Sequence, residues 1–310
     1  MGWLDRLRPQ LVVLLLVVFG AVPYIVINNY PVGGKLVVRS DPTVRPFVFP
    51  SGGRQLFPGY RLVALYGTPD TPALGALGQQ SAPASIARVK GLAHQYQALT
   101  HEHILPTLEI IATVASASPT EDGDYSYQIP MATLQRWVTM ARAAGVYVVL
   151  DLQSGRASFL SQAEQLEQLL VQPNVGLALD PEWRLKADQL PLEQIGSVSI
   201  TEVNQTVRWL ATLTSHYKLP QKLLLLHEFR LDMLPNRDKL DTSHANLAYA
   251  VQMDGQGSQA AKLATWRAIL QDAPAQLHFG WKNFYKMDSQ LRSPAATMKL
   301  SPQPWYVSYQ

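Results

Sequence analysis

From residue 61 onward, short runs of apolar and β-branched residues alternate with segments of helical periodicity. This order is typical of β-α units, in which successive strands lie parallel in one sheet. Eight such runs occur over about 250 residues, which is the strand number and the length of a (β/α)8, TIM-type barrel. The runs expected to form strands are Leu62–Tyr66, Thr107–Ala112, Val146–Gln153, Val175–Glu182, Lys222–Glu228, Leu247–Asp254, Gln276–Lys282 and Trp305–Tyr309.

The segments between most of these runs carry apolar residues at helical spacing. The expected helices are Pro83–Leu99, Pro130–Ala144, Ser158–Val171, Glu202–Tyr217 and Gln259–Leu270. An open, doubly wound α/β sheet is the main alternative to the barrel. No G-x-G-x-x-G follows the first strand, so a dinucleotide site has no support.

Two prolines set the expected limits of strands, because proline cannot donate a hydrogen bond to a neighbouring strand. Pro106 restricts the second strand to residues from Thr107 onward. Pro181 ends the ladder pairing of the fourth strand near Asp180 and leaves Glu182 beyond it.

The composition excludes several classes of protein. With 47% hydrophobic residues the chain can bury a large core, which excludes disorder as its main state. The net charge is only +3 and reflects a slight imbalance, so we expect no nucleic-acid partner. Cysteine is absent, which excludes disulfides, thiolate metal sites and a cysteine nucleophile.

The N-terminal region carries 17 uncharged residues at positions 11–27 (LVVLLLVVFGAVPYIVI), after Arg6 and Arg8. A membrane-spanning helix needs about 20 apolar residues, within a range of roughly 17–25. We therefore expect a short tail over residues 1–9 and a transmembrane anchor over 10–27. Arg6 and Arg8 favour an N-terminus in the cytoplasm, which makes this a single-pass protein of the cytoplasmic membrane with its barrel on the extracytoplasmic side. A cleaved signal peptide and a buried core helix are the alternatives.

Residues 28–60 hold five prolines and five glycines. Such a stretch cannot form a long helix, and it is predicted to be a linker. The barrel domain is expected over residues 61–310.

The alternation of side chains within two strands predicts a functional site. In the fourth strand, Asp180 and Glu182 share a face with small residues, while the other face is apolar. The sixth strand repeats the pattern with Gln252 and Asp254. Because successive side chains point to opposite faces, the acidic faces are expected to point into the barrel at the C-terminal ends of the strands, where barrel active sites form.

Other strand ends add polar and aromatic groups to this rim. The further candidates for substrate binding are Tyr66, Glu109, Asp151, Gln153, Trp183, His227, Glu228, Trp281, Lys282 and Trp305. Crowded carboxylates raise one another's pKa, as general-acid chemistry requires, and flat aromatic rings can stack on sugars. A single acid at a strand end is more often a helix cap, so the interpretation depends on several acids meeting in one place.

Metal and serine chemistry have less support. His101-Glu102-His103 has the residue types of a metal site, but it precedes the second strand and so lies at the opposite end of the barrel. Neither H-E-x-x-H nor G-x-S-x-G occurs. No metal and no cofactor are expected, and a metal-dependent hydrolase is the third choice among the functions.

Asp180-Pro181-Glu182 resembles the end of the D-x-x-D-x-D-x-E signature of family-eighteen chitinases, which are glycoside hydrolases. The resemblance implies that Glu182 is the general acid and that Asp180 helps to position the substrate. Tyr249–Asp254 and Trp305 correspond to further site positions of that family. Val175 and Ala178 stand where the signature has its two earlier acids, so the match covers only its end.

Four longer stretches resemble a bacterial, mainly actinobacterial, family of envelope-anchored barrel proteins. They are Val175–Arg184, Leu219–Arg230, Gln252–Gly257 and Gly280–Tyr285. This resemblance covers residues 60–310 and implies fold and location rather than a reaction.

Two functions are therefore expected. The first is a membrane-anchored, glycoside-hydrolase-like barrel acting on envelope glycan, with Glu182 as the acid and Asp180 or Asp254 as its partner. The second is a non-catalytic barrel that binds glycan or serves as an accessory subunit of a membrane complex. Carboxylates locked in ion pairs with Lys282 or Arg184 would favour the second.

Overall fold

The computed structural model describes residues 49 and 52–310. Within this part of the chain, no helix is both long and apolar enough to cross a bilayer. The anchor predicted over residues 10–27, and most of the predicted linker, lie outside it.

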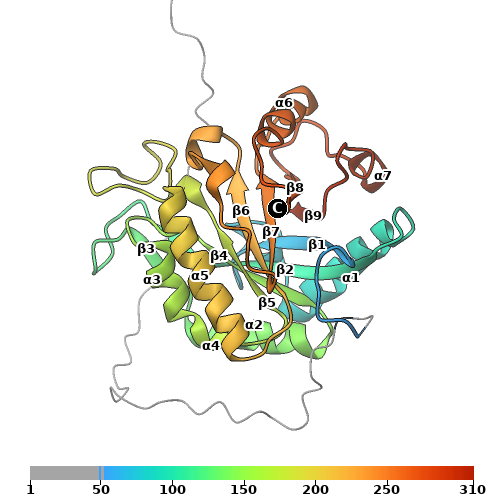
Figure 1. Cartoon of the computed structure of the whole chain (residues 1–310), viewed down its shortest axis with the longest axis horizontal. Coiled ribbons are helices and arrows are strands. Elements are labelled where there is room, and N and C mark those ends of the chain that lie inside the picture. Colours follow the sequence, from blue (N-terminus) through green and yellow to red (C-terminus); the bar gives the residue numbers. More distant parts are fainter. Residues whose placement is uncertain (1–48, 50–51) are drawn as a thin grey trace, which may run out of the picture. The chain divides into compact units, whose positions relative to one another are not determined.

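Eight parallel strands close into a barrel, as the sequence predicts. In order around the barrel they are β1 (Tyr60–Gly67), β2 (His103–Ala115), β4 (Tyr147–Leu152), β5 (Val175–Leu179), β6 (Lys222–Glu228), β7 (Leu247–Met253), β8 (Leu277–Asn283) and β9 (Tyr306–Tyr309). Parallel pairing of β9 with β1 completes the closure (Figure 1). The short strand β3 (Ser126–Gln128) pairs antiparallel with the end of β2 and extends the sheet beyond the barrel.

Helices and short 3-10 turns connect the strands. They are η1 (Leu77–Gln79), α1 (Ala82–Gln97), α2 (Met131–Ala143), α3 (Phe159–Gln165), α4 (Glu167–Leu170), η2 (Pro181–Trp183), α5 (Ile200–His216), η3 (Leu231–Met233), η4 (Arg237–Lys239), α6 (Gln259–Ile269) and α7 (Pro294–Thr297). The helix predicted over Ser158–Val171 is divided at Leu166 into α3 and α4. The connection from β6 to β7 has only η3 and η4, whereas α5 and α3 lie side by side on the outside of the barrel (Figure 1).

The second strand begins earlier than predicted, at His103, and includes Pro106. Backbone donors alternate between the two sides of a strand, and the N–H of His103 points towards β1, where it donates to the carbonyl of Gly59. Pro106 therefore lacks its donor on the β4 side, and pairing with β4 starts only at Thr107. Pro181 ends β5 at Leu179, as predicted.

The end of the predicted linker packs against the barrel. Phe49, Leu56 and Phe57 are buried together with residues that face the barrel interior. The backbone N–H groups of Leu56 and Phe57 donate to Oε1 of Gln221, at 2.8 and 3.1 Å. These apolar side chains cover the N-terminal end of the barrel, which we call the closed end.

Two apolar clusters build the core. The larger lies between the barrel and its helices, and the smaller fills the lower part of the barrel interior with residues such as Leu62, Leu105, Leu223 and Leu225. The interior-facing positions nearer the C-terminal strand ends are polar instead. We call this polar end the barrel mouth; its residues are Tyr66, Glu109, Asp151, Gln153, Asp180, Glu182, His227, Gln252, Asp254, Lys282, Tyr306 and Ser308.

Candidate functional site

His227 lies at the centre of the barrel mouth between two carboxylates. Its Nδ1 is 2.7 Å from Oδ2 of Asp254, and its Nε2 is 2.7 Å from Oε1 of Glu109. All three side chains are buried. An ionised carboxylate only accepts hydrogen bonds, so an imidazolium ring, which has two N–H donors, suits a position between two carboxylates. Burial alone would lower the pKa of His227, but the surrounding carboxylates raise it well above its usual value.

Lys282 is the second cation of the barrel mouth, on β8. Its Nζ lies 3.0 Å from Oδ1 and 3.1 Å from Oδ2 of Asp254, and 3.7 Å from the centre of the Tyr66 ring. Burial raises the pKa of Asp254, but the charges of Lys282 and His227 outweigh burial and lower it below its usual value. Asp254 is therefore an ionised carboxylate held by two cations.

Asp151 has a different environment on β4. Its Oδ2 accepts a hydrogen bond of 2.9 Å from the Tyr66 hydroxyl, while its buried Oδ1 has no hydrogen-bond partner. Burial raises the pKa of Asp151 to about 6, and Glu109 adds to the rise. The Nε2 of Gln153 lies 3.4 Å from the same Tyr66 oxygen.

Asp180 and Glu182 stand where β5 ends. Oδ1 of Asp180 accepts a hydrogen bond of 3.2 Å from the N–H of Glu182, which caps η2. Burial and neighbouring acids raise the pKa of Asp180 well above its usual value. Glu182 is partly exposed. Burial raises its pKa to about 7, and the charge of Asp254 makes the largest further contribution. Glu182 is thus a partly exposed carboxyl group that holds its proton to a higher pH than usual.

The turn that carries Glu182 is fixed by Gly196. The N–H of Gly196 donates to the carbonyl oxygen of Glu182 at 2.7 Å. A Cβ at Gly196 would lie 2.5–2.6 Å from the carbonyl oxygens of Pro181, Glu182 and Arg184. This approach is possible only for glycine, so residue 196 sets the position of the acid.

Two residues of the barrel mouth on β9 were not predicted. The Tyr306 hydroxyl donates to Oε2 of Glu109 at 3.0 Å, and the Ser308 hydroxyl accepts from Nε2 of Gln252. Trp305 was the residue predicted on this strand, whereas Tyr306 and Ser308 share the other face. The period of two that identified Asp180 and Asp254 would also have identified them.

Three of the predicted residues lie away from the barrel mouth, and for these the expectation was wrong. Glu228 pairs with Arg237, and the Trp281 ring packs edge-on against Trp266 on α6, because both side chains follow the outward face of their strands. Trp305 lies at the closed end, where its ring contacts Phe57. Trp183 is partly exposed in η2, next to Glu182.

The barrel mouth contains one set of side chains that could hold a metal ion, among the described residues. Ligand atoms of Asp180, His227 and Asp254 lie within 4.8 Å of one another. Both nitrogens of His227 are already hydrogen-bonded to carboxylates, and Asp254 contacts Lys282. A metal ion would have to displace these contacts and lie beside a lysine, so these residues fit a metal poorly.

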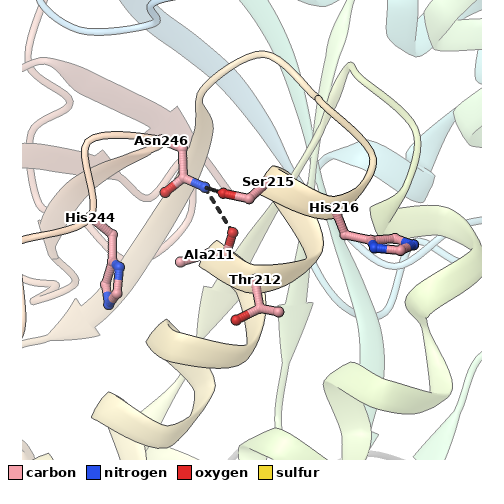
Figure 2. Close-up of a pocket in the computed structure, with 6 residues that line it drawn as sticks. All are labelled: Ala211, Thr212, Ser215, His216, His244 and Asn246. Carbon is pink, nitrogen blue, oxygen red and sulfur yellow. Dashed lines mark hydrogen bonds between the residues drawn. The ribbon is translucent and has the colours of Figure 1, made fainter.

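A hollow of about 450 Å³ lies far from these acids, at the end of α5 and the start of β7 (Figure 2). Its two histidines, His216 and His244, point in different directions, and no acidic residue lines it. The Nδ2 of Asn246 donates hydrogen bonds to the carbonyl oxygen of Ala211 and to the hydroxyl oxygen of Ser215, at 2.7 and 2.9 Å. This region therefore has a structural role.

No protein-family model matches the sequence, and no curated protein matches it either. A closed parallel barrel hosts many unrelated reactions, so the fold by itself does not identify the chemistry. The function has to be inferred from the groups of the barrel mouth.

Proposed function

We propose that the protein is a glycoside-hydrolase-like barrel that acts on cell-envelope glycan, with Glu182 as general acid and Asp254 as the second carboxylate. The observation that carries this proposal is that one mouth holds two carboxyl groups in different surroundings, one without an ion pair among the described residues and one held between two cations. Glu182 makes no ion pair with a described residue and has a pKa of about 7, whereas Asp254 contacts both Lys282 and His227. Carboxyl pairs whose pKa values are separated by their surroundings are what glycosidic cleavage uses.

Cleavage of a glycosidic bond needs a proton for the leaving oxygen and negative charge near the anomeric carbon. Glu182 donates its proton to that oxygen as the C–O bond breaks. Asp254 remains ionised and stabilises the positive charge that develops on the sugar ring. A water molecule then bonds to the anomeric carbon, supplies the hydroxyl group of the product and gives its other proton to the Glu182 carboxylate. Asp180 positions the acid through its hydrogen bond to the backbone of Glu182.

The location forms part of the same proposal. The uncharged run at residues 11–27 would anchor the chain in the cytoplasmic membrane, and the proline- and glycine-rich stretch that follows would hold the barrel near the surface. An envelope glycan is then the polymer within reach.

One observation favours a second candidate function, a non-catalytic barrel that binds glycan or belongs to a membrane complex. Asp254 is held in an ion pair with Lys282, and most of the other carboxyl groups in the barrel mouth are fully buried. Glu182 is the exception, because it is partly exposed and makes no ion pair with a described residue. The two candidates therefore differ in whether Glu182 transfers its proton.

The test uses the full chain in mild detergent, with envelope polysaccharides and with aryl glycosides as substrates. We expect Glu182→Gln to lose about 10²–10⁴-fold in the rate of polysaccharide cleavage, because the general acid is removed. The loss should be much smaller for glycosides whose leaving group needs no proton. Glu193→Gln, at an exposed position in the same loop, is the matched control.

The outcomes separate the two candidates. Unchanged cleavage by Glu182→Gln would remove that residue from catalysis. Binding of polysaccharide without release of reducing ends by the unmodified chain would favour the non-catalytic barrel.

A further inference from the structure

The barrel mouth holds more acidic than basic side chains. Its five carboxyl groups belong to Glu109, Asp151, Asp180, Glu182 and Asp254, and its two cations are His227 and Lys282. Of these five carboxyl groups, the cations form ion pairs with those of Glu109 and Asp254, at 2.7–3.1 Å. Within residues 52–310, no ion pair involves the other three carboxyl groups.

Asp151 has an unpartnered oxygen in the barrel mouth. It is fully buried, and only one of its two oxygens has a hydrogen-bond partner, the Tyr66 hydroxyl. The other oxygen, Oδ1, is buried without a partner. Leaving a buried acceptor unpaired is unfavourable, and more so for a charged group, so a bound donor at this point would be stabilising.

An organic cation suits these acids better than a metal ion. The set of ligand atoms close enough for a metal is Asp180, His227 and Asp254, and two of these residues already have cationic or carboxylate partners. Asp151, Asp180 and Glu182 do not form such a set. An ammonium group has three N–H donors and is carried on a carbon framework, so it can bond to acids that lie too far apart for one metal ion.

We propose that the barrel mouth recognises a substrate bearing a primary ammonium group, such as an oligosaccharide of unacetylated amino sugars, through Asp151 and Asp180. This inference rests on the proposed function and names its substrate class. The ammonium group donates to Oδ1 of Asp151 and to the carboxylate of Asp180, and its charge ionises both. The proton on Glu182 remains available for the leaving oxygen, because the two ionised neighbours disfavour a third negative charge.

The test measures binding by titration calorimetry. The full chain carrying Glu182→Gln, which prevents turnover, is titrated with the tetramer of glucosamine and with the tetramer of N-acetylglucosamine. We expect the amine to bind at least about tenfold more tightly, a difference of about 1.4 kcal/mol. Its binding enthalpy should change with the ionisation enthalpy of the buffer, because the carboxyl groups release protons on binding.

Variants in the same background assign the preference to Asp151. Asp151→Asn should reduce the preference for the amine to less than about threefold. Asp232→Asn is the matched control, because Asp232 is an exposed acid that pairs with the exposed Arg230. It should leave the preference unchanged.

Three results would overturn the inference: equal or tighter binding of the acetylated tetramer, an unchanged preference in Asp151→Asn, or binding of neither tetramer. Cleavage by the unmodified chain is measured separately. A preference for the amine without cleavage of any glycan would overturn the proposed function and leave this inference standing. Cleavage without a preference for the amine would overturn this inference and leave the proposed function standing.

Discussion

Two buried lysines lie at opposite ends of the barrel strands, and their pKa values are shifted in opposite directions. Lys222 begins β6 near the closed end, where its Nζ donates to the carbonyl oxygens of Gln172 and Val175 at 2.8 and 2.7 Å. Lys282 lies near the end of β8 in the barrel mouth, against Asp254. Burial lowers the pKa of Lys222 to about 7. For Lys282, burial is outweighed by Asp254 and the other acids, and the pKa is raised.

The difference shows that the partners of a buried group, more than its burial, decide its charge. A neutral amine satisfies two carbonyl oxygens as well as an ammonium does, so the closed end needs no charge. The barrel mouth maintains charges at the centre of a protein because each cation lies against an acid. Burying these charges costs desolvation free energy, which favours a functional reason for their presence in the barrel mouth.

The largest expected effect on stability follows from removing the charge of Lys282 in the barrel mouth. Lys282→Met should reduce the free energy of unfolding by about 3–5 kcal/mol at pH 7, because Asp254 loses one of its two counter-charges. Urea denaturation measures the change. Lys286→Met, at an exposed position nearby, is the control. If Lys282→Met lowers the free energy of unfolding no more than Lys222→Met does, the two buried lysines do not differ in their electrostatic contribution to stability.

A smaller effect of opposite sign is expected at Asp151. Its pKa in the folded protein, about 6, is raised above the usual 3.8, so its contribution to stability is present at low pH and is lost as the pH rises through about 4 to 6. Asp151→Asn should therefore leave stability almost unchanged at pH 4 and increase it at pH 8 by at most about 3 kcal/mol. Denaturation at the two pH values tests this. If Asp151→Asn instead lowers the free energy of unfolding at pH 8, the surroundings of Asp151 stabilise its ionised form.

The smallest effect concerns the closed end. The pKa of Lys222 is lower in the folded than in the unfolded chain, so the unfolded chain binds the extra proton between about pH 7 and 10. Raising the pH then favours the folded state, by about 1 kcal/mol per pH unit. Between pH 7.5 and 9, Lys222→Met should remove this part of the increase in the free energy of unfolding. Lys186→Met, at an exposed position, should not remove it. An identical slope in both variants would argue that Lys222 is charged when folded.

Much of the barrel could be predicted, because strand alternation and strand number are local properties of the sequence. The period of two predicted that Asp180 and Asp254 face the barrel interior, and the positions of Glu109 and Asp151 at strand ends predicted that they lie at the same rim. The period of two also applies to β6. His227 and Glu228 are adjacent and must point to opposite faces, so naming both could bring only one of them into the barrel.

The pairing of these groups could not be predicted. Nothing in the sequence of β6 indicates that His227 lies between Glu109 and Asp254, because that contact depends on the register of strands far apart in the chain. The packing of Phe57 at the closed end was also missed. A proline- and glycine-rich composition predicts the absence of a long helix, but it does not show where single apolar residues will be buried.

Gly196 has a consequence for any attempt to alter this protein. The residue contributes no functional group, yet three carbonyl oxygens of the loop that carries Glu182 lie where its side chain would begin. Substitutions that are meant to change the substrate preference can be made on β2, β4 and β7, because a side chain on one of these strands can be changed without changing the others. The loop after β5 has no such freedom: a single added methyl group at residue 196 would shift the backbone that carries Glu182 without contacting its side chain.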